Sequence, residues 1–267
     1  MPHELPAVNF TRAIVRPPGQ NFASGLTSGE GAPDFQLALQ QHSRYCDTLR
    51  ACGLELTRLD ADPGHPDGTF VEDTGILTAR GAILARPGAA SRLGEIDRVG
   101  RVVQSFYPDM QHIDAPGTVD GGDVAQAEGH FFIGVSARTN DEGARQLKLL
   151  LEGMGYSASL IDIRTSRALL HLKTGIAYLG DGIWVIAAAI EGEPQVLRQL
   201  NIREFVSVDA DEGYAANCVR VNDVVLVAAG YPRIAEALDR KGLRPLPLDM
   251  SEFKKMDGGL SCLSLRF

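Results

Sequence analysis

The alternation of apolar and polar residues predicts the same order of elements several times along the chain. Short apolar runs come in pairs, and each pair is followed by an amphipathic stripe and one more apolar run. Apolar runs of about four to eight residues bounded by turn residues are typical of strands, and apolar residues spaced by three and four are typical of helices. The predicted repeating unit is therefore strand-strand-helix-strand.

Four internal copies of this unit follow one another. The paired strands are predicted at 70–78 with 81–85, 119–127 with 131–135, 175–179 with 183–188, and 216–221 with 224–229. The helices that follow are predicted at 92–105, 140–152, 194–200 and 231–240, and the closing strands at 110–113, 157–163, 205–208 and 243–248.

A fifth unit is divided between the two ends of the chain. The N-terminal part supplies a strand at 10–15, a helix at 34–52 that Gly53 stops, and a strand at 54–59, and the C-terminal part supplies a strand at 260–267. Repeats of about 50 residues indicate radial arrays, and a divided unit closes the ring and leaves no free edges. We predict an α/β fold, a five-bladed propeller of ββαβ units, with residues 1–267 forming a single catalytic domain. A doubly wound sheet would not explain the paired strands.

Composition narrows the class of protein. With 267 residues, 44% of them hydrophobic, the chain can bury a substantial core without disulfides or metals. The four cysteines form no CxxC motif and no Cys/His cluster, so we expect reduced thiols and a cytoplasmic protein. The net charge of -8 argues against a nucleic-acid partner and is compatible with a small cationic ligand. Neither the first ten residues nor any later run has the apolar length of a targeting or membrane segment, so no membrane association is expected.

Polar residues recur at one place in the repeat, at or just before the first strand of each unit. They are Glu72 and Asp73, Asp120 and Asp123, His171, Asn217, and Cys262. If the first strands line the axis of the ring, these side chains converge in the middle. Buried ionisable groups are costly unless they are paired, so their recurrence at one position favours a functional cluster.

Each residue taken alone has an ordinary structural explanation. His171 could be a satisfied core histidine, Asp120 a turn residue before two glycines, and Cys262 an inert thiol in a strand. Taken together they form a coherent set, in which a thiolate attacks an electrophilic carbon, an imidazole transfers protons and a carboxylate orients the imidazole. The position in the repeat favours this second interpretation.

The surplus of carboxylates suggests the substrate. Asp67, Glu72 and Asp73 would oppose formation of a thiolate unless the ligand is itself a cation, and a guanidinium presents a planar fork of donors to carboxylates. Arg92 and Arg138 could hold the carboxylate of an amino acid, although either could be a surface residue. The loop 25–29, with Leu26 between glycines, resembles a mobile lid or an ordinary connector.

At these residues the chain closely resembles the dimethylarginine dimethylaminohydrolases, and most of all their bacterial form. This family belongs to the guanidine-modifying superfamily, whose fold is the five-bladed pentein propeller. The resemblance is carried by FVEDTGILTARGAILARPGAASR at 70–92, APGTVDGGDV at 115–124, FFIGVSARTN at 131–140, HLKTG at 171–175, YAANC at 214–218 and DGGLSCLSLRF at 257–267.

The resemblance implies a role for each matching residue. Cys262 would be the nucleophile, His171 the general acid and base, and Asp120 the carboxylate that partners the histidine. The substrate-binding residues that it implies are Leu26 of the lid, Asp67 and Asp73 at the guanidinium with Glu72 beside them, Arg92 and Arg138 at the α-carboxylate, and the main-chain carbonyl of Met256 at the α-amino group. The implied reaction forms a covalent S-alkylthiouronium intermediate and releases dimethylamine and then citrulline, with no metal or organic cofactor.

Position 120 departs from the pattern of the close bacterial relatives, where the resemblance leads us to expect glutamate. Asp120 is one methylene shorter. We therefore expect it to hold His171 less directly, or through a water molecule.

Three alternatives remain open at this point. Arginine deiminases carry an aspartate two residues after the histidine, where this chain has Lys173, and they are usually longer. A non-catalytic ribosome-binding pentein should have a basic face and lack the catalytic set, whereas a catalytically silent arginine sensor would keep the pocket. The sequence does not choose among methylated arginines, and a homodimer paired through an exposed blade is compatible with it.

Overall fold

Five small sheets of three strands make up the framework of the chain. The computed structural model describes residues 9–29, 31–166, 169–202 and 204–267. The first two strands of every sheet are antiparallel, and the second and third strands are parallel. This order of strands confirms the predicted ββαβ unit and the five-bladed α/β propeller.

The first two sheets consist of β15 (Ser264–Arg266), β1 (Arg12–Val15) and β2 (Glu55–Arg58), and of β3 (Gly75–Thr78), β4 (Gly81–Leu84) and β5 (Gln111–His112). The others consist of β6 (Val124–Ala127), β7 (His130–Val135) and β8 (Ser157–Asp162), of β9 (Ile176–Tyr178), β10 (Trp184–Ala187) and β11 (Val206–Val208), and of β12 (Val219–Val221), β13 (Val224–Ala228) and β14 (Pro245–Leu248).

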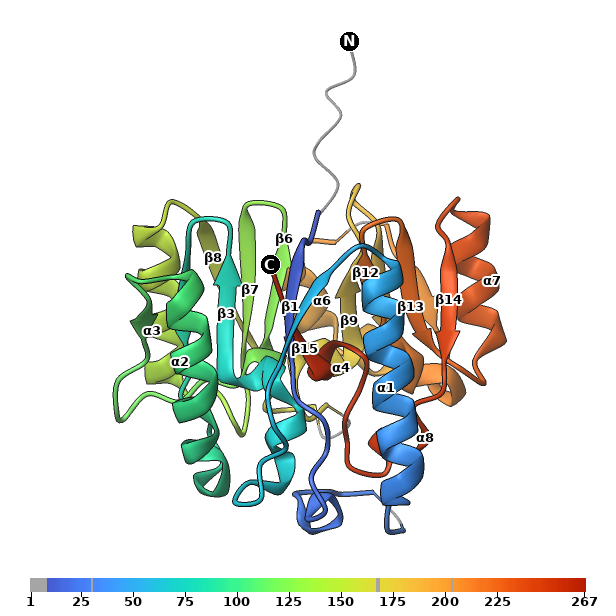
Figure 1. Cartoon of the computed structure of the whole chain (residues 1–267). Coiled ribbons are helices and arrows are strands. Elements are labelled where there is room, and N and C mark those ends of the chain that lie inside the picture. Colours follow the sequence, from blue (N-terminus) through green and yellow to red (C-terminus); the bar gives the residue numbers. More distant parts are fainter. Residues whose placement is uncertain (1–8, 30, 167–168, 203) are drawn as a thin grey trace.

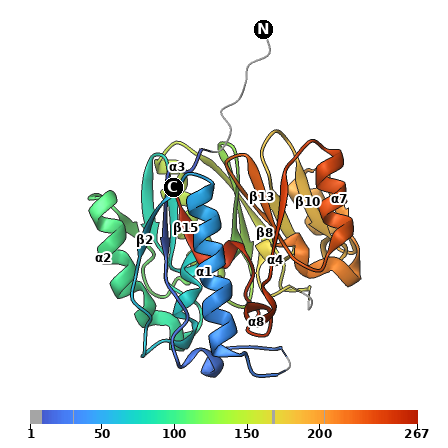
Figure 2. The ribbon, with the colours of Figure 1, turned by 45° about the vertical axis from the view of Figure 1, so that its right-hand side comes forward.

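A helix joins the two parallel strands of each sheet. These helices are α1 (Phe35–Ala51), α2 (Ile96–Phe106), α3 (Asp141–Gly153), α6 (Pro194–Leu200) and α7 (Pro232–Arg240). They lie on the outside of the molecule and the strands lie inside (Figures 1 and 2). Each helix packs between its own sheet and a neighbouring one, and the buried apolar side chains of all three elements form one core cluster.

The sequence of α1 illustrates why these helices form. Asp34 caps its N-terminus, because the carboxylate accepts the N–H of Leu37. On the buried face of the helix, Ala38 lies two turns before Tyr45 and Leu49 one turn after it, and all three side chains are fully enclosed. The predicted helix therefore agrees with the observed one to within a residue at either end.

The fifth sheet joins the two ends of the described chain. Strand β15 pairs antiparallel with β1, with Ala13 opposite Arg266 and Val15 opposite Ser264, and β1 pairs in parallel with β2. This pairing confirms the prediction that the divided unit closes the ring.

The first strand of each unit is shorter than predicted. A helical turn occupies the first part of each predicted strand or directly precedes it. Four of these are 3-10 helices, and the fifth is the one-turn α-helix α4 (Leu172–Gly175). The 3-10 helices are Val71–Thr74, Gly121–Asp123, Ala210–Ala216 and Ser261–Leu263. Cys262 therefore lies in a 3-10 turn, and its predicted place on a strand is wrong. A buried turn has no polar face, so its sequence shows no helical spacing of polar residues. A short apolar run in such a turn therefore looks the same as a buried strand.

Two short helices were not predicted, α5 (Ala188–Glu191) and α8 (Ser251–Lys254). Both are single turns, too short to show a helical spacing of apolar residues. Among the described residues, no helix combines the length and the apolar character that crossing a bilayer requires. The predicted absence of a targeting segment concerns residues that in part lie outside the described ranges.

Candidate active site

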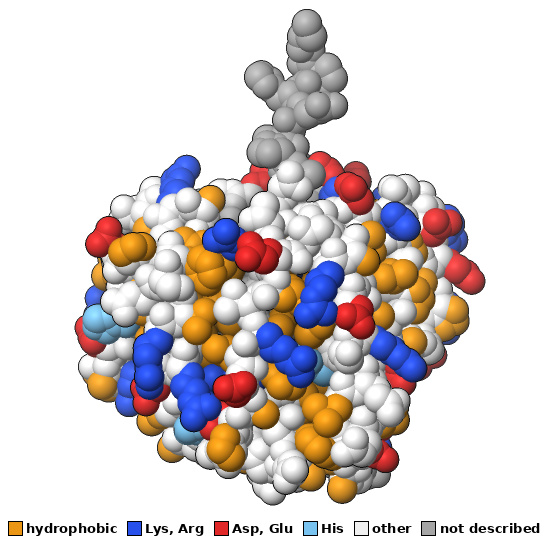
Figure 3. Space-filling view, viewed as in Figure 1, with side chains coloured by type: hydrophobic (Ala, Val, Ile, Leu, Met, Phe, Trp, Pro, Cys, Tyr) orange, Lys and Arg blue, Asp and Glu red, His pale blue; other side chains and the backbone are white. Residues whose placement is uncertain are grey.

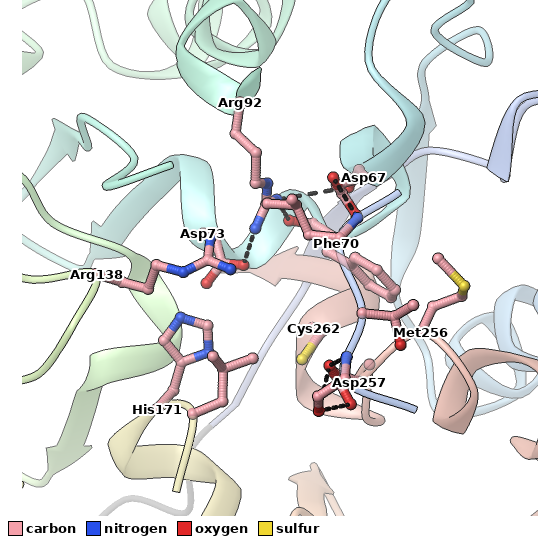
Figure 4. Close-up of a pocket in the computed structure, with 14 residues that line it drawn as sticks. Asp67, Phe70, Asp73, Arg92, Arg138, His171, Met256, Asp257 and Cys262 are labelled. Carbon is pink, nitrogen blue, oxygen red and sulfur yellow. Dashed lines mark hydrogen bonds and ion pairs between the residues drawn. The ribbon is translucent and has the colours of Figure 1, made fainter. Parts of the chain in front are cut away.

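The tight turns that precede the inner strands bring the predicted polar residues together. A cavity of about 280 Å³ opens between them. Side chains from four of the five units border it (Figure 4). The lining residues are Leu26, Thr27, Ser28, Asp67, Phe70, Asp73, Arg92, Arg138, Leu170, His171, Met256, Asp257, Gly258 and Cys262.

The thiol of Cys262 faces this cavity from the 3-10 turn Ser261–Leu263 (Figure 4). The N–H of Gly259 points at Sγ from 3.4 Å. Desolvation and then the carboxylates of Glu72 and Asp73 raise the pKa of the thiol to about 12. The group is therefore a neutral thiol near pH 7, and it needs an added positive charge to ionise.

The imidazole of His171 approaches the cavity from the opposite side, at the start of α4. Its Nε2 lies 3.1 Å from Oδ2 of Asp120, so the contact is direct and the expectation of a looser or water-mediated one is wrong. Burial alone lowers the pKa of His171, but the charges of Asp73, Asp123 and Asp120 outweigh it and raise the pKa to about 9. The imidazole therefore carries a proton at neutral pH.

Two glycines allow these groups to meet. A Cβ atom on Gly122 would lie 2.9 Å from the ring of His171, and one on Gly121 would lie 2.0 Å from the carbonyl oxygen of Glu72. Any side chain would push the turn Gly121–Asp123 away from both neighbours. Asp120 is held in turn by the N–H of Gly88, which donates to Oδ1 at 2.8 Å.

Asp73 and Arg92 form a buried ion pair at the back of the cavity. Nη1 of Arg92 lies 2.6 Å from Oδ2 of Asp73, and the guanidinium also donates to Glu95 and to the carbonyl of Phe70. Burial raises the pKa of Asp73, but the charges of Arg92 and His171 lower it further than burial raises it. Asp73 is therefore ionised, and Arg92 keeps one N–H on Nη1 without an acceptor among the described residues.

The second predicted arginine, Arg138, has the freer side chain. Its guanidinium is 19% exposed and lines the cavity, and within the described chain its charged neighbour is Asp120 at 3.9 Å. Asp67 also lines the cavity, and burial raises its pKa. The cavity is thus cationic at one part of its wall and anionic at another.

Glu72 contributes its charge from behind the nucleophile and not from the cavity wall. It does not line the cavity but is buried behind the thiol, where its carboxylate accepts Ser261 Oγ at 2.7 Å and pairs with Lys173 at 2.6 Å and with Arg266 at 3.5 Å. The neighbouring residue, Asp73, does line the cavity. The two side chains of this turn therefore diverge, and Asp73 alone of the pair presents its carboxylate to the cavity.

The loop predicted as a lid lies at the edge of the cavity. The N–H of Leu26 donates to both carboxylate oxygens of Asp67 at 3.0 and 3.2 Å, and Thr27 Oγ1 donates to the carbonyl of Lys255. Ser28 donates to Asp257 from both its N–H and its hydroxyl. Leu26 is 41% exposed, so the loop covers the cavity with a partly solvated apolar side chain.

Met256 and Asp257 line the cavity beside this loop, and Asp257 was not among the predicted site residues. Asp257 adopts φ of 57°, in the left-handed region that few residues other than glycine, asparagine and aspartate tolerate. The sequence Asp257-Gly258-Gly259 signals this turn, and the apolar lining residues Phe70 and Leu170 gave no comparable signal.

Three groups lie close enough together to be considered for a metal ion. Asp73, Asp120 and His171 each offer one ligand atom, and these atoms lie within 4.8 Å of one another. The carboxylates already accept hydrogen bonds from Arg92, Gly122 and Gly88, and two guanidinium groups line the same cavity. A cation would have to displace these donors, so the residues present do not fit a metal.

Comparisons with known proteins identify relatives that match nearly the whole chain. The N(G),N(G)-dimethylarginine dimethylaminohydrolase of Pseudomonas aeruginosa is 44% identical over 97% of this chain and all of its own length. The chain belongs to the dimethylarginine dimethylaminohydrolase family. The member of this family from Streptomyces coelicolor is 33% identical, over 96% of each chain. No model of a protein family matches the chain.

Solved structures of the dimethylarginine dimethylaminohydrolase family have the same fold. A cysteine-to-serine variant of the P. aeruginosa protein in complex with citrulline superimposes with a TM-score of 0.91, at 43% identity over 97% of this chain and all of that one. The N-terminal domain of ArgZ, 18% identical, covers 96% of this chain and 97% of its own with a TM-score of 0.85, and supports the fold alone.

Proposed function

We propose that this protein hydrolyses Nω-methylated arginines, namely asymmetric dimethylarginine and monomethylarginine, to citrulline and dimethylamine or methylamine. The observation that carries the proposal is that the thiol of Cys262 and the imidazole of His171 face one cavity, whose walls also carry carboxylates and the partly exposed side chain of Arg138. An amino acid with a guanidinium group matches this distribution of charge.

Substrate binding would follow the charges of the wall. The carboxylates of Asp67 and Asp73 would face the guanidinium, and Arg138 would bind the α-carboxylate, with Arg92 adding its remaining N–H. The main-chain carbonyl of Met256 would accept the α-amino group and Leu26 would cover the ligand. Glu72 would act at a distance, through its charge behind the thiol.

Ionisation of the thiol would be assisted by the substrate. A guanidinium close to Sγ offsets the negative charges that raise the pKa of Cys262, so the proton leaves to solvent as the cation enters. The thiolate would then form a bond to the central guanidinium carbon. This order explains how a cysteine with a strongly raised pKa can serve as a nucleophile.

His171 would carry out the proton transfers. The imidazolium donates its proton to the methylated nitrogen, the carbon–nitrogen bond breaks, and the amine leaves. The neutral imidazole next takes a proton from water, which attacks the covalent thiouronium carbon. The carbon–sulfur bond breaks, citrulline is released, and Asp120 holds the ring in place throughout.

The arginine deiminase alternative is less well supported. A deiminase would need a carboxylate at the position of Lys173, and this lysine instead pairs with Glu72 and does not line the cavity. The nitrogen that leaves therefore faces no dedicated acceptor, which suits a methylated nitrogen that has fewer N–H groups to donate.

The proposal is tested by measuring citrulline formed from asymmetric dimethylarginine, monomethylarginine and arginine. We expect preferential turnover of the methylated substrates, no turnover by Cys262→Ser, and unchanged turnover by Cys52→Ser, which alters a second partly exposed thiol. Faster turnover of arginine would instead make the protein a deiminase. Tight binding of a methylarginine without turnover would make it a sensor.

The remaining expectations extend this proposal. We place the enzyme in the cytoplasm, in agreement with its four free thiols, and we propose that residues 1–267 form a single catalytic domain. We also propose a homodimer paired through an exposed blade, which light scattering of the purified chain would test.

A further inference from the structure

A further buried carboxylate, Asp123, lies directly behind the catalytic set; its charge helps to raise the pKa of His171, but no step of the proposed mechanism uses it. It ends the 3-10 turn that Asp120 precedes, and it is fully buried and does not line the cavity. No cation pairs with it within the described residues, and burial raises its pKa to about 6. An unpaired buried carboxylate is costly, so its hydrogen bonds must account for its place.

Every partner of Asp123 donates to it. Oδ1 accepts the N–H of Leu172 at 3.0 Å, and Oδ2 accepts Ser136 Oγ at 2.6 Å and Thr139 Oγ1 at 2.7 Å. Leu172 directly follows His171, so this bond fixes the peptide that carries the catalytic imidazole. The carboxylate therefore joins the start of α4 to the loop between β7 and α3.

The two hydroxyl groups extend this connection further. Ser136 Oγ accepts the N–H groups of Arg138 and Thr139 at 2.9 and 3.1 Å, and Thr139 Oγ1 accepts the N–H of Asp120 at 3.1 Å. Because these acceptor positions are taken, the hydroxyl protons must point to Asp123. Position 123 therefore requires a side chain that only accepts hydrogen bonds. An asparagine there would place its own N–H against another hydrogen-bond donor.

We propose that Asp123 is a positioning residue that sets the catalytic His171 and the substrate-binding Arg138 in one fixed geometry. It reaches the histidine through the peptide of Leu172 and the arginine through Ser136. This inference rests on the proposed function, because Arg138 matters only if the ligand carries an anionic end. Asp123 itself touches no substrate.

The experiment compares Asp123→Asn with Ser136→Ala and a control. Glu212→Gln provides the control, because Glu212 is also a buried carboxylate that accepts two backbone N–H groups, those of Arg233 and Ile234, far from the cavity. For each variant, kcat and KM for asymmetric dimethylarginine are measured together with the pKa of the imidazole of His171, followed by NMR and assigned with His171→Gln.

Asp123→Asn should lower kcat by about tenfold or more and raise KM, and the pKa of His171 should fall because one negative charge is gone. The other charged or titratable groups around the imidazole, which stay in place, are Asp73, Asp120, Arg92, Arg138 and the thiol of Cys262. Ser136→Ala keeps the charge of Asp123. It should raise KM by about tenfold, leave kcat within about threefold, and leave the pKa of the histidine unchanged.

Three results would overturn the proposal. The first is Asp123→Asn with wild-type kinetics and a wild-type pKa of His171, whatever its stability. The second is an equal change in Glu212→Gln, which would indicate a general effect of buried carboxylates. The third result applies if Asp123→Asn does not fold: an unchanged KM in Ser136→Ala would then overturn the proposal. Should the wild type turn over no methylarginine, the proposed function fails, while the pKa of His171 in Asp123→Asn still tests the coupling.

Discussion

Nε2 of His171 lies 3.1 Å from Oδ2 of Asp120, a direct contact made by a side chain one methylene shorter than the expected glutamate. The contact is possible because the turn that follows Asp120 contains two glycines, and Gly122 lies against the imidazole ring. The two glycines thus let Asp120 and His171 meet directly.

The first prediction concerns this contact. Asp120→Asn should lower kcat by about 10- to 100-fold, because the imidazolium loses a charge-assisted hydrogen bond and its orientation. A surface pair provides the control: His112 lies 3.3 Å from Asp114 with both side chains mostly exposed. Asp114→Asn should leave kcat unchanged, and an equal effect in both variants would remove the special role of Asp120.

The second prediction concerns the stability of the fold as a function of pH. The pKa of His171 is raised from 6.5 to about 9, so the folded protein favours the protonated ring. The contribution, up to about 3 kcal/mol, is fully present below pH 6.5 and disappears as the pH rises through 9. Urea unfolding of the wild type and of His171→Gln should therefore differ more at pH 6 than at pH 10. A difference that does not depend on pH would contradict the assigned charge.

The third prediction concerns the charge behind the nucleophile. Glu72 helps to raise the pKa of Cys262, so Glu72→Gln should speed alkylation of the thiol by iodoacetamide at pH 8 by about tenfold. Lys173→Met should slow it, because Lys173 pairs with Glu72 and lowers the pKa of the thiol. Mass spectrometry of the modified peptide gives the rate. Equal rates in all three proteins would mean that this ion pair does not control the thiol.

The fourth prediction concerns the loop over the cavity. Ser28→Ala removes the hydroxyl that donates to Asp257, and should raise KM for asymmetric dimethylarginine about three- to tenfold with little change in kcat, because the loop closes less firmly. Ser105→Ala on the outer helix α2 is the matched control, since its hydroxyl donates only to the carbonyl of Val102. A fall in kcat without a change in KM would show that the loop acts on the chemistry instead.

The order of elements could be predicted from the sequence because it repeats. Each unit shows two short apolar runs, a helical stripe such as that of Ala38, Tyr45 and Leu49, and a third run, and the structure has this order in all five sheets. The starts of the inner strands could not be predicted, because Val71 and the residues after it are buried in a turn that shows no alternation.

The positions of the polar residues were predicted better than their directions. Their recurrence in the repeat brought Asp73, His171 and Cys262 to one cavity, as expected. Whether a side chain faces the cavity or the interior depends on the local geometry of the turn. The sequence could therefore place Glu72 and Asp123 near the axis, but it could not predict that their side chains point away from the cavity. Their partners, Ser261 and Ser136, are distant in sequence and become visible only in the folded chain.

The pairing of β1 with β15 has a consequence for cooperativity. Residues about 250 positions apart share one sheet, and a single residue, Leu263, separates Cys262 from β15. If this sheet separates, the ring opens and the nucleophile leaves His171, while the other four sheets can remain intact. Local unfolding that separates β1 from β15 can therefore disrupt the active site without global unfolding of the chain.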